Sequence, residues 1–323
     1  MSAYYEFKLP AKILSGDGAL EHIPHELDSL GAHRPLLLSD QGLEQVGTVK
    51  IVQAALRQGG MAAAETFCRI PPDSSIQVVN QIAGLYRQAQ CDSLIAVGGG
   101  SVIDTAKGVG MVLAQAGSDL LDSAGCEVLP RGAHVPFVAV PTTAGTGSEV
   151  DAGGVLSCED NDEKLRLGDP RLFPVLSIVD PELMASVPAR LTAYQGFDAL
   201  FHCVECYISN TNTPMGDMVC REGIRRAAAA LPTCVNDGDD MEARSSLAFA
   251  NTLGGYAMDA SGTTGSHGLE HGMSAHHHDL PHGAGLIMIA RAYHTWMIDH
   301  GAAPERYIDM ARLMGNATAS DPH

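Results

Sequence analysis

Residues 91–115 read CDSLIAVGGGSVIDTAKGVGMVLAQ, and this stretch decides the fold. An apolar run up to Val97 predicts a buried strand, and the glycines at 98–100 predict a tight turn after it. The residues beyond the turn predict a helix with one apolar side, formed by Val102, Ala106, Val109 and Val112. A glycine turn between a strand and a helix can hold a phosphate at the helix N-terminus. Because the stretch is neither GxGxxG nor a P-loop, a tight turn without a ligand stays open on this motif alone.

Similar patterns extend on both sides of this stretch. Apolar strands are predicted in HRPLLLSD (33–40), HVPFVAVPTT (134–143) and VLSIVDP (175–181), and a helix is predicted over 49–57. Strands that alternate with helices favour a mostly parallel sheet covered on both faces. After Pro188 the spacing becomes helical and strand signals almost vanish. The prediction is an α/β N-terminal domain with a parallel sheet over residues 1–186 and an all-α C-terminal domain over residues 187–323.

Composition limits the classes of partner. The chain has 323 residues and a net charge of −18, which disfavours binding to nucleic acid or to anionic membranes. No apolar run is long enough for a transmembrane helix, and MSAYYEFKLP at the start does not resemble a secretory signal. The eight cysteines are scattered, which indicates reduced thiols in a cytoplasm. Cys203 and Cys206 form a CxxC inside a predicted helix, where buried small side chains are the favoured interpretation.

Two segments strengthen the prediction of a nucleotide site. PTTAGTGSEV (141–150) gathers hydroxyls and glycines after a strand, at the end where open α/β sheets bind ligands. Asp40 follows the strand PLLLS, where a carboxylate could bind ribose hydroxyls and repel a 2′-phosphate, which favours NAD over NADP. The alternative for Asp40 is a helix cap.

Four side chains form a candidate metal site. Asp198 and His202 stand four residues apart in GFDALFHCVE, so a helix presents both on one face. His267 and His282 come from SHGLEHGMSAHHHDLPHGAG, where His282 follows a proline that suits a helix start. One carboxylate and three imidazoles fit Fe(II), Zn(II), Mn(II) or Co(II). With a redox cofactor in the same chain, such a metal would serve as a Lewis acid for alcohol chemistry.

Taken in order, GGGSVIDTAKG, PTTAGTGSEV, GFDALFHCVECYIS and HGLEHGMSAHHHDLPHGAG resemble the iron-containing (group III) alcohol dehydrogenases. The resemblance runs from Ser15 to Gly315 and implies a dehydroquinate synthase-like architecture, in which a dinucleotide-binding α/β domain precedes a helical metal-binding domain. The family continues for several more helices, so the resemblance implies that this chain lacks the last of them. The stretch between His271 and His282 is one residue longer than the usual family spacing.

The resemblance also implies roles for individual residues. The metal ligands fall on Asp198, His202, His267 and His282, and the extra active-site histidine falls on His271. His271 either exchanges a proton with solvent or only orients the nicotinamide. The contacts to NAD fall on the following residues: Asp40, Asp73, Gly99, Gly100, Ser101, Val102, Ile103, Thr142, Thr143, Thr146, Lys164 and Leu183. The family favours iron as the metal, and zinc is the alternative.

The leading hypothesis is a metal-dependent, NAD-dependent alcohol dehydrogenase or aldehyde reductase that acts on small primary alcohols or diols, as a homodimer or larger homo-oligomer. A glycerol dehydrogenase-like enzyme shares the architecture. A dehydroquinate synthase-like lyase is disfavoured, because the ligand segments hold almost no Lys or Arg for an anionic substrate. A non-catalytic protein that binds metal and nucleotide is the alternative from another class. Glu205 and Glu270 are expected to point to other helix faces than the ligands beside them, although either could support a ligand.

Overall fold

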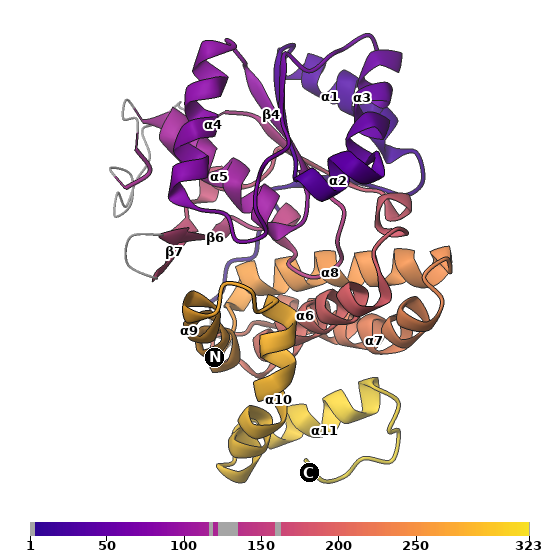
Figure 1. The fold of residues 1–323 in the computed structure, drawn as a ribbon. Coiled ribbons are helices and arrows are strands. Elements are labelled where there is room, and N and C mark those ends of the chain that lie inside the picture. The colour runs from indigo at the N-terminus through magenta and orange to yellow at the C-terminus, as the bar shows by residue number, and fades with distance from the viewer. Residues whose placement is uncertain (1–3, 116–118, 122–134, 159–162, 323) are drawn as a thin grey trace. The chain divides into compact units, whose positions relative to one another are not determined.

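A computed structural model describes residues 4–115, 119–121, 135–158 and 163–322 of the chain, which forms two compact units. One unit comprises Pro10–Thr142 and Ser148–Leu183. The other comprises Met1–Leu9, Thr143–Gly147 and Met184–His323. The short segment Thr143–Gly147 therefore belongs to the second unit, although the residues on both sides of it belong to the first (Figure 1).

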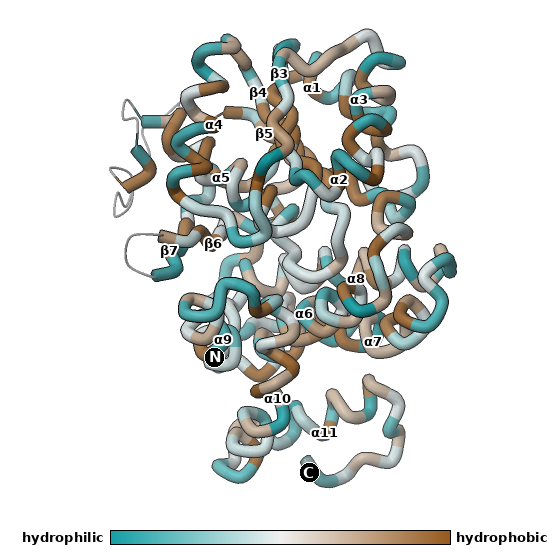
Figure 2. Tube along the Cα trace, in the orientation of Figure 1, coloured by the Kyte–Doolittle hydropathy of each residue, from teal (hydrophilic) through white to brown (hydrophobic). Residues whose placement is uncertain are grey.

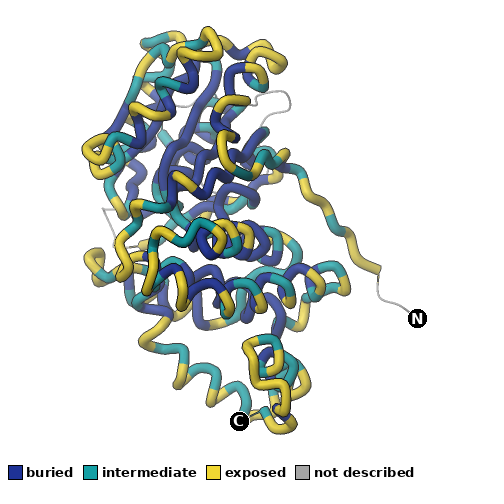
Figure 3. Tube along the Cα trace, turned by 90° about the vertical axis from the view of Figure 1, so that its right-hand side faces the viewer, coloured by how far each residue is buried: buried dark blue, intermediate teal, exposed yellow. Residues whose placement is uncertain are grey.

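The first unit is built on a six-stranded sheet in which all paired strands run parallel, as the sequence predicts. The strand order is β1-β8-β5-β4-β2-β3. The strands are β1 (Lys12–Ser15), β2 (Pro35–Leu38), β3 (Glu65–Phe67), β4 (Ser93–Gly98), β5 (Phe137–Pro141) and β8 (Leu176–Val179). The inner strands are fully buried, dark blue in Figure 3, and apolar, brown in Figure 2.

Alternate residues of each strand serve the two faces of this sheet. Leu94 and Ala96 of β4 pack in one apolar cluster with α4 (Ile76–Gln88) and α5 (Gly100–Ala114). Ile95 of β4 packs in the other cluster with α1 (Ile23–Ser29) and α3 (Thr48–Gln58). Side chains alternate between the two faces of the sheet, and helices cover both faces. Both sets of side chains are therefore apolar, and each strand is a continuous apolar run in the sequence.

A buried lysine ties α5 to the segment that follows β5. The Nζ atom of Lys107 has no exposed surface and lies 2.7 Å from Ser148 Oγ, 2.6 Å from Asp151 Oδ1 and 2.5 Å from the carbonyl oxygen of Gly153. These contacts satisfy its three donors. They anchor an antiparallel hairpin, β6 (Gly153–Cys158) and β7 (Glu163–Gly168), which no pattern in the sequence predicted.

The second unit is helical, again as predicted. Helices α6, α7 and α8 pack against one another, and α10 packs on α6 and α9. The helices are α6 (Ala189–Ile208), α7 (Pro214–Asn236), α8 (Met241–Ser261), α9 (Gly265–His276), α10 (His282–Asp299) and α11 (Pro304–Leu313). Cys203 and Cys206 are buried in α6, and neither they nor the other described cysteines form a disulfide; Cys126 lies outside the described residues. In the part of the chain that the structure describes, no helix is long and apolar enough to cross a membrane.

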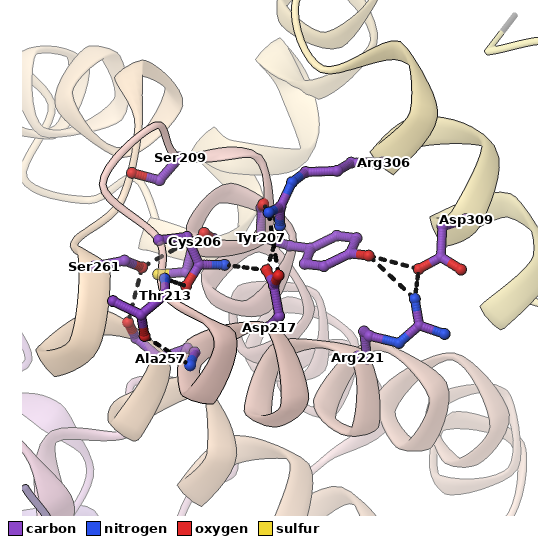
Figure 4. A network of polar contacts seen from close by, with 12 residues as sticks. Cys206, Tyr207, Ser209, Thr213, Asp217, Arg221, Ala257, Ser261, Arg306 and Asp309 are labelled. Carbon is purple, nitrogen blue, oxygen red and sulfur yellow. Dashed lines mark hydrogen bonds and ion pairs between the residues drawn. The ribbon is translucent and has the colours of Figure 1, made fainter. Parts of the chain in front are cut away.

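Charged groups connect helix α11 to α6 and α7 (Figure 4). Arg306 pairs with Asp217 of α7 and donates to the carbonyl oxygen of Tyr207 in α6, 2.6 Å away. Asp309 accepts a 2.7 Å hydrogen bond from the Tyr207 hydroxyl and pairs with Arg221 of α7. The guanidinium carbon of Arg306 also lies 4.6 Å from the centre of the Tyr207 ring. Beside these polar contacts, α11 buries the side chains of Tyr307 and Met310.

We expect Asp309→Asn to loosen α11. The charges of the pair with Arg221 are partly exposed, so the loss amounts to about 1 kcal/mol and hydrogen exchange in α11 becomes roughly five-fold faster. Added salt should reduce the difference in the hydrogen-exchange rate of α11 between the variant and the parent protein, since salt screens exposed ion pairs. Exchange measured by mass spectrometry tests this, with the exposed Asp239→Asn as control. Equal exchange in α11 for all three proteins would contradict the role of the pair.

Candidate active site

Helix α6 supplies a carboxylate and an imidazole on one face. Asp198 and His202 are each only 4% exposed. His202 Nε2 lies 3.6 Å from Asp198 Oδ1, which is the arrangement expected for residues four apart in a helix. The two ligand-type side chains are thus fixed by one rigid element.

Two further imidazoles converge on the same carboxylate oxygen. His267, near the start of α9, places Nε2 at 3.5 Å from Asp198 Oδ1. His282, the first residue of α10, places Nε2 at 3.6 Å from it. Three Nε2 atoms from three helices therefore surround one oxygen. The structure brings the four predicted ligands together.

The arrangement of these atoms fits a metal ion. Ligands about 2.1 Å from an ion at tetrahedral angles lie about 3.4 Å apart, and the three distances to Asp198 Oδ1 are close to this value. The ligand atoms of Asp198, His267 and His282 also all lie within 4.8 Å of one another, a group that does not include His202. Asp198 Oδ1 and His267 Nε2 are buried and have no hydrogen-bond partner among the described residues. Buried polar atoms without partners are costly, and a coordinated ion would satisfy both of them.

The other ring nitrogen of each histidine meets an acceptor. His202 Nδ1 lies 3.2 Å from the carbonyl oxygen of Gly145. His267 Nδ1 lies 2.5 Å from Glu205 Oε1, and His282 Nδ1 bonds Glu270 Oε2. Since carbonyl and carboxylate oxygens accept hydrogen bonds, each Nδ1 carries a hydrogen. A metal ion would therefore bind through each Nε2, after displacing any proton that this nitrogen carries.

Glu205 and Glu270 are structural partners for which the sequence left open whether either supports a ligand. Both are fully buried. Each supports the histidine of the next helix: Glu205 of α6 holds His267 of α9, and Glu270 of α9 holds His282 of α10. The expectation that they point to other helix faces than the ligands beside them is wrong, whereas the possibility that either supports a ligand-type histidine agrees with these contacts. Their position three residues after a ligand was a usable signal, because residues three apart share a helix face.

The charges of the centre favour a cation. Burial disfavours the imidazolium of His202 and lowers its pKa to about 4. Burial also opposes a charge on His267, but the neighbouring Asp198 and Glu205 outweigh it and raise its pKa to about 9. Burial opposes ionisation of Asp198, yet His202 and His282 hold its pKa well below the usual range. A positive charge, proton or metal, is therefore favoured between the carboxylates.

We expect Glu205→Gln and Glu270→Gln each to weaken metal binding roughly 10- to 100-fold, since loss of such a partner frees the ligand ring. Competition with a coloured chelator measures the dissociation constant of the metal. The conservative Glu242→Gln, at the exposed start of α8, serves as the control. Unchanged affinity in both site variants would show that the two carboxylates do not orient the ligands.

His271 lies at the edge of this centre. Its ring centroid is 5.3 Å from that of His282 and 6.5 Å from that of His267. The side chain is only partly buried. A position beside the ligands with partial exposure is compatible with both predicted roles, proton exchange and orientation of the nicotinamide.

Several of the predicted nucleotide contacts lie at the carboxyl ends of neighbouring strands. Asp40 follows β2, Gly99–Ile103 follow β4, and Thr142 follows β5. Strands β2, β4 and β5 are adjacent and parallel, so these residues share one edge of the sheet. Asp40 also caps α2 (Gln41–Val46), because its Oδ1 accepts a 2.9 Å hydrogen bond from the Leu43 amide.

Other predicted contacts have structural partners of their own. Lys164 Nζ lies 2.5 Å from Asp73 Oδ1, and Ser157 Oγ lies 2.6 Å from the same oxygen. Ser101 Oγ donates to the carbonyl oxygen of Pro72. The side chains of Val102, Ile103 and Leu183 are buried in the apolar clusters of the sheet. Their backbone amides donate to the carbonyl oxygens of Gly99, Gly99 and Asp180, respectively.

The segment Thr143–Gly147 packs within the helical unit. The amide of Gly147 donates a 2.8 Å hydrogen bond to Asn251 Oδ1 of α8, and a Cβ atom at Gly147 would lie 2.5 Å from the amide nitrogen of Gly255. Gly147 also has a positive φ of 65°. Its glycine is thus explained by close packing on α8, while Thr143 and Thr146 stay predicted cofactor contacts.

These features define a class of protein: a parallel α/β unit joined to a helical unit with a buried centre of three histidines and one aspartate. A model of the family described as iron-containing alcohol dehydrogenase matches residues 10–181. A model of the C-terminal part of the Fe-containing alcohol dehydrogenase family matches residues 192–323. The chain belongs to the iron-containing alcohol dehydrogenase family.

Individual relatives agree with this assignment. Choline dehydrogenase of Bacillus subtilis (strain 168) is 32% identical over 99% of this chain and 79% of its own length. NAD-dependent methanol dehydrogenase of Bacillus methanolicus is 32% identical over 96% of this chain and 80% of its own. The crystal structure of a 1,3-propanediol oxidoreductase has a TM-score of 0.92 at 33% identity and covers 99% of this chain and 82% of its own. The prediction of an alcohol dehydrogenase of the iron-containing type is confirmed, and the family supports NAD and iron as its cofactors.

Proposed function

We propose that this chain interconverts small primary alcohols or diols and their aldehydes with NAD at a single metal centre. The observation that carries the proposal is the convergence of three imidazole Nε2 atoms on one buried carboxylate oxygen. Asp198, His202, His267 and His282 hold the metal, iron in preference to zinc. When bound, the metal supplies Lewis-acid polarisation of the substrate oxygen, and NAD supplies the hydride acceptor.

The protein's own groups bind and orient these components. Gly145, Glu205 and Glu270 hold the three rings so that their lone pairs face one point. Asp198 and His267 are buried, which strengthens electrostatic interactions at the centre.

We assign the nucleotide to the sheet edge of the first unit. There the amides at the start of α5 would bind the pyrophosphate. Asp40 would bind the adenosine ribose and select NAD. The other proposed contacts are those that the family resemblance implies: Asp73, Gly99, Gly100, Ser101, Val102, Ile103, Thr142, Thr143, Thr146, Lys164 and Leu183.

His271 is proposed to exchange the hydroxyl proton of the substrate with solvent. An imidazole beside the centre with a partly exposed ring can relay a proton at neutral pH. A role in proton exchange predicts that His271→Gln changes the pH profile of kcat more than the affinity for NAD. A change confined to the affinity for NAD would assign His271 to nicotinamide orientation instead.

A direct assay tests the proposed function. Protein loaded with Fe(II) without oxygen, and in parallel with Zn(II), is given NAD or NADP and a series of short alcohols, diols and choline. Formation of NADH with small primary alcohols or diols is the expected result. Tight binding of NAD and metal without hydride transfer would support a non-catalytic protein. Turnover without net NADH would support a lyase.

Location and assembly are also proposals. The scattered cysteines favour a cytoplasmic location, and the family resemblance implies a homodimer or larger homo-oligomer. Sedimentation of the purified chain and fractionation of cells test these two points separately from the activity.

A further inference from the structure

His202 is held differently from the other two imidazoles of the centre. The Nδ1 atoms of the other two rings meet buried carboxylates that stand on α6 and α9. His202 Nδ1 instead meets the backbone carbonyl oxygen of Gly145, 3.2 Å away. Gly145 lies in neither a helix nor a strand, because β5 ends at Pro141 and the next element, the short helix η2 (Ser148–Val150), begins three residues later. Contacts outside regular secondary structure must therefore fix the position of this carbonyl.

Close packing fixes part of that position. A Cβ atom at Gly145 would lie 3.0 Å from the Cα atom of Gln195 in α6, and one at Gly147 would lie 2.5 Å from the amide nitrogen of Gly255 in α8. The main chain of the segment Thr143–Gly147 therefore contacts both helices directly. Packing limits how closely the segment approaches, whereas a hydrogen bond also fixes the direction of the peptide group.

Asn251 of α8 supplies such a directional contact. Its side chain is only 1% exposed, and its Oδ1 accepts a 2.8 Å hydrogen bond from the amide of Gly147. Asn251 stands four residues before Gly255, so both face the segment from the same side of α8. A Cβ atom at Gly254 would lie 3.3 Å from the Cβ atom of His202, so α8 also borders the ligand itself. A buried amide that loses its acceptor is costly, and the segment would shift to reduce that cost.

We propose that Asn251 is a positioning residue for the metal ligand His202. The Asn251 side chain holds the amide of Gly147. That amide and the carbonyl of Gly145 belong to adjacent, rigid peptide units, so a shift of one moves the other. The carbonyl in turn orients the His202 ring, as the acceptor of a ligand histidine does. This role rests on the proposed metal centre, because His202 is one of its four proposed ligands.

The test is the binding of Co(II), one of the ions that suit these ligands. Asn251→Ala is expected to weaken Co(II) binding roughly 10-fold, at the lower end for a lost ligand partner, because the effect on His202 is indirect. Competition with a coloured chelator measures the dissociation constant of Co(II). The visible absorption of the bound ion, which depends on the geometry of its ligands, should also change. Asn251→Asp keeps an oxygen acceptor at the same place and should restore most of the affinity.

Thr252→Val is the matched control. Thr252 is the next residue of α8, is 2% exposed, and donates its hydroxyl to the carbonyl oxygen of Ala248 in the same helix. Its replacement also removes one buried polar group, but we expect the dissociation constant and the absorption of Co(II) to stay those of the parent. Thermal unfolding of the metal-free proteins separates a general loss of stability from a change at the ligand. If Asn251→Ala does not fold, Asn251→Ser, whose shorter side chain weakens the same hydrogen bond, replaces it.

Two results would overturn the role of Asn251. One is parent-like affinity and absorption of Co(II) in the Asn251→Ala protein, even if that protein is less stable. The other is an equal loss of affinity in Thr252→Val. The metal centre is tested separately by Asp198→Ala: retention of Co(II) in that variant would refute the centre and this role with it. Loss of Co(II) there, with parent-like binding in Asn251→Ala, would refute the role of Asn251 alone.

Discussion

Asp198→Ala is expected to lower kcat/KM for alcohol oxidation by roughly 10³-fold or more and to abolish stoichiometric metal binding. Asp198 Oδ1 is the one atom that all three imidazoles approach, at 3.5 to 3.6 Å. Without it, three neutral donors remain and no anionic ligand offsets the charge of a divalent ion. A metal that acts as a Lewis acid stabilises the transition state by several kcal/mol, and losing this stabilisation corresponds to the roughly 10³-fold lower kcat/KM.

Metal analysis and initial rates on the same preparation measure both effects. The exposed Asp239→Asn is the control for a lost carboxylate elsewhere in the helical unit. Full metal content with unaltered kcat/KM in the Asp198 variant would remove Asp198 from the site. Full metal content with lost activity would show that Asp198 acts on the substrate instead of on the metal.

Gly283→Ala is expected to destabilise the helical unit by about 3 kcal/mol. This value is at the upper end of the usual cost of forcing extra atoms into a well-packed site. A Cβ atom at this position would lie 2.1 Å from the carbonyl oxygen of Tyr194 in α6. The neighbour is backbone and cannot rotate away, so α10 must move from α6. Because His282 precedes this contact directly, metal affinity should fall together with stability.

Urea denaturation of the metal-free protein measures the stability change without the contribution of metal binding. Gly272→Ala in α9 is the matched control, because a Cβ atom there meets nothing within 4 Å. That control should be stabilised by roughly 0.5 to 1 kcal/mol, since alanine favours a helix more than glycine does. A Gly283 variant as stable as the Gly272 variant would contradict the close approach of α10 to α6.

Much of the fold follows from local patterns. The apolar runs of β2, β4, β5 and β8 predict strands buried on both faces, and the structure confirms them. Short edge strands gave no such signal: β1 is only partly buried, and β3 spans three residues, of which one is buried. The β6–β7 hairpin was missed because its strands are half-exposed and lack a clear apolar run.

The candidate site also has features that the sequence predicts and features that it does not. The spacing of Asp198 and His202 predicts a shared face, because four residues make about one helical turn. The glycines of PTTAGTG suggested a nucleotide loop, whereas Gly147 packs on α8 and Gly145 offers its carbonyl to His202. No spacing in the sequence links Gly145 to a residue 57 positions away.

The sequence by itself determined the buried central strands, the shared helix face of Asp198 and His202 and, through four motifs, the family. Only the tertiary structure decided that His267 and His282 meet Asp198, that Glu205 and Glu270 hold rings on other helices, and that Gly283 and Gly285 admit the close contacts of α10. The physical reason is that sequence patterns are local, whereas these contacts join residues far apart in the chain. Periodicity reports which side chains share a face of one helix, but which faces meet depends on how helices pack, and that is settled by contacts between residues far apart in the chain.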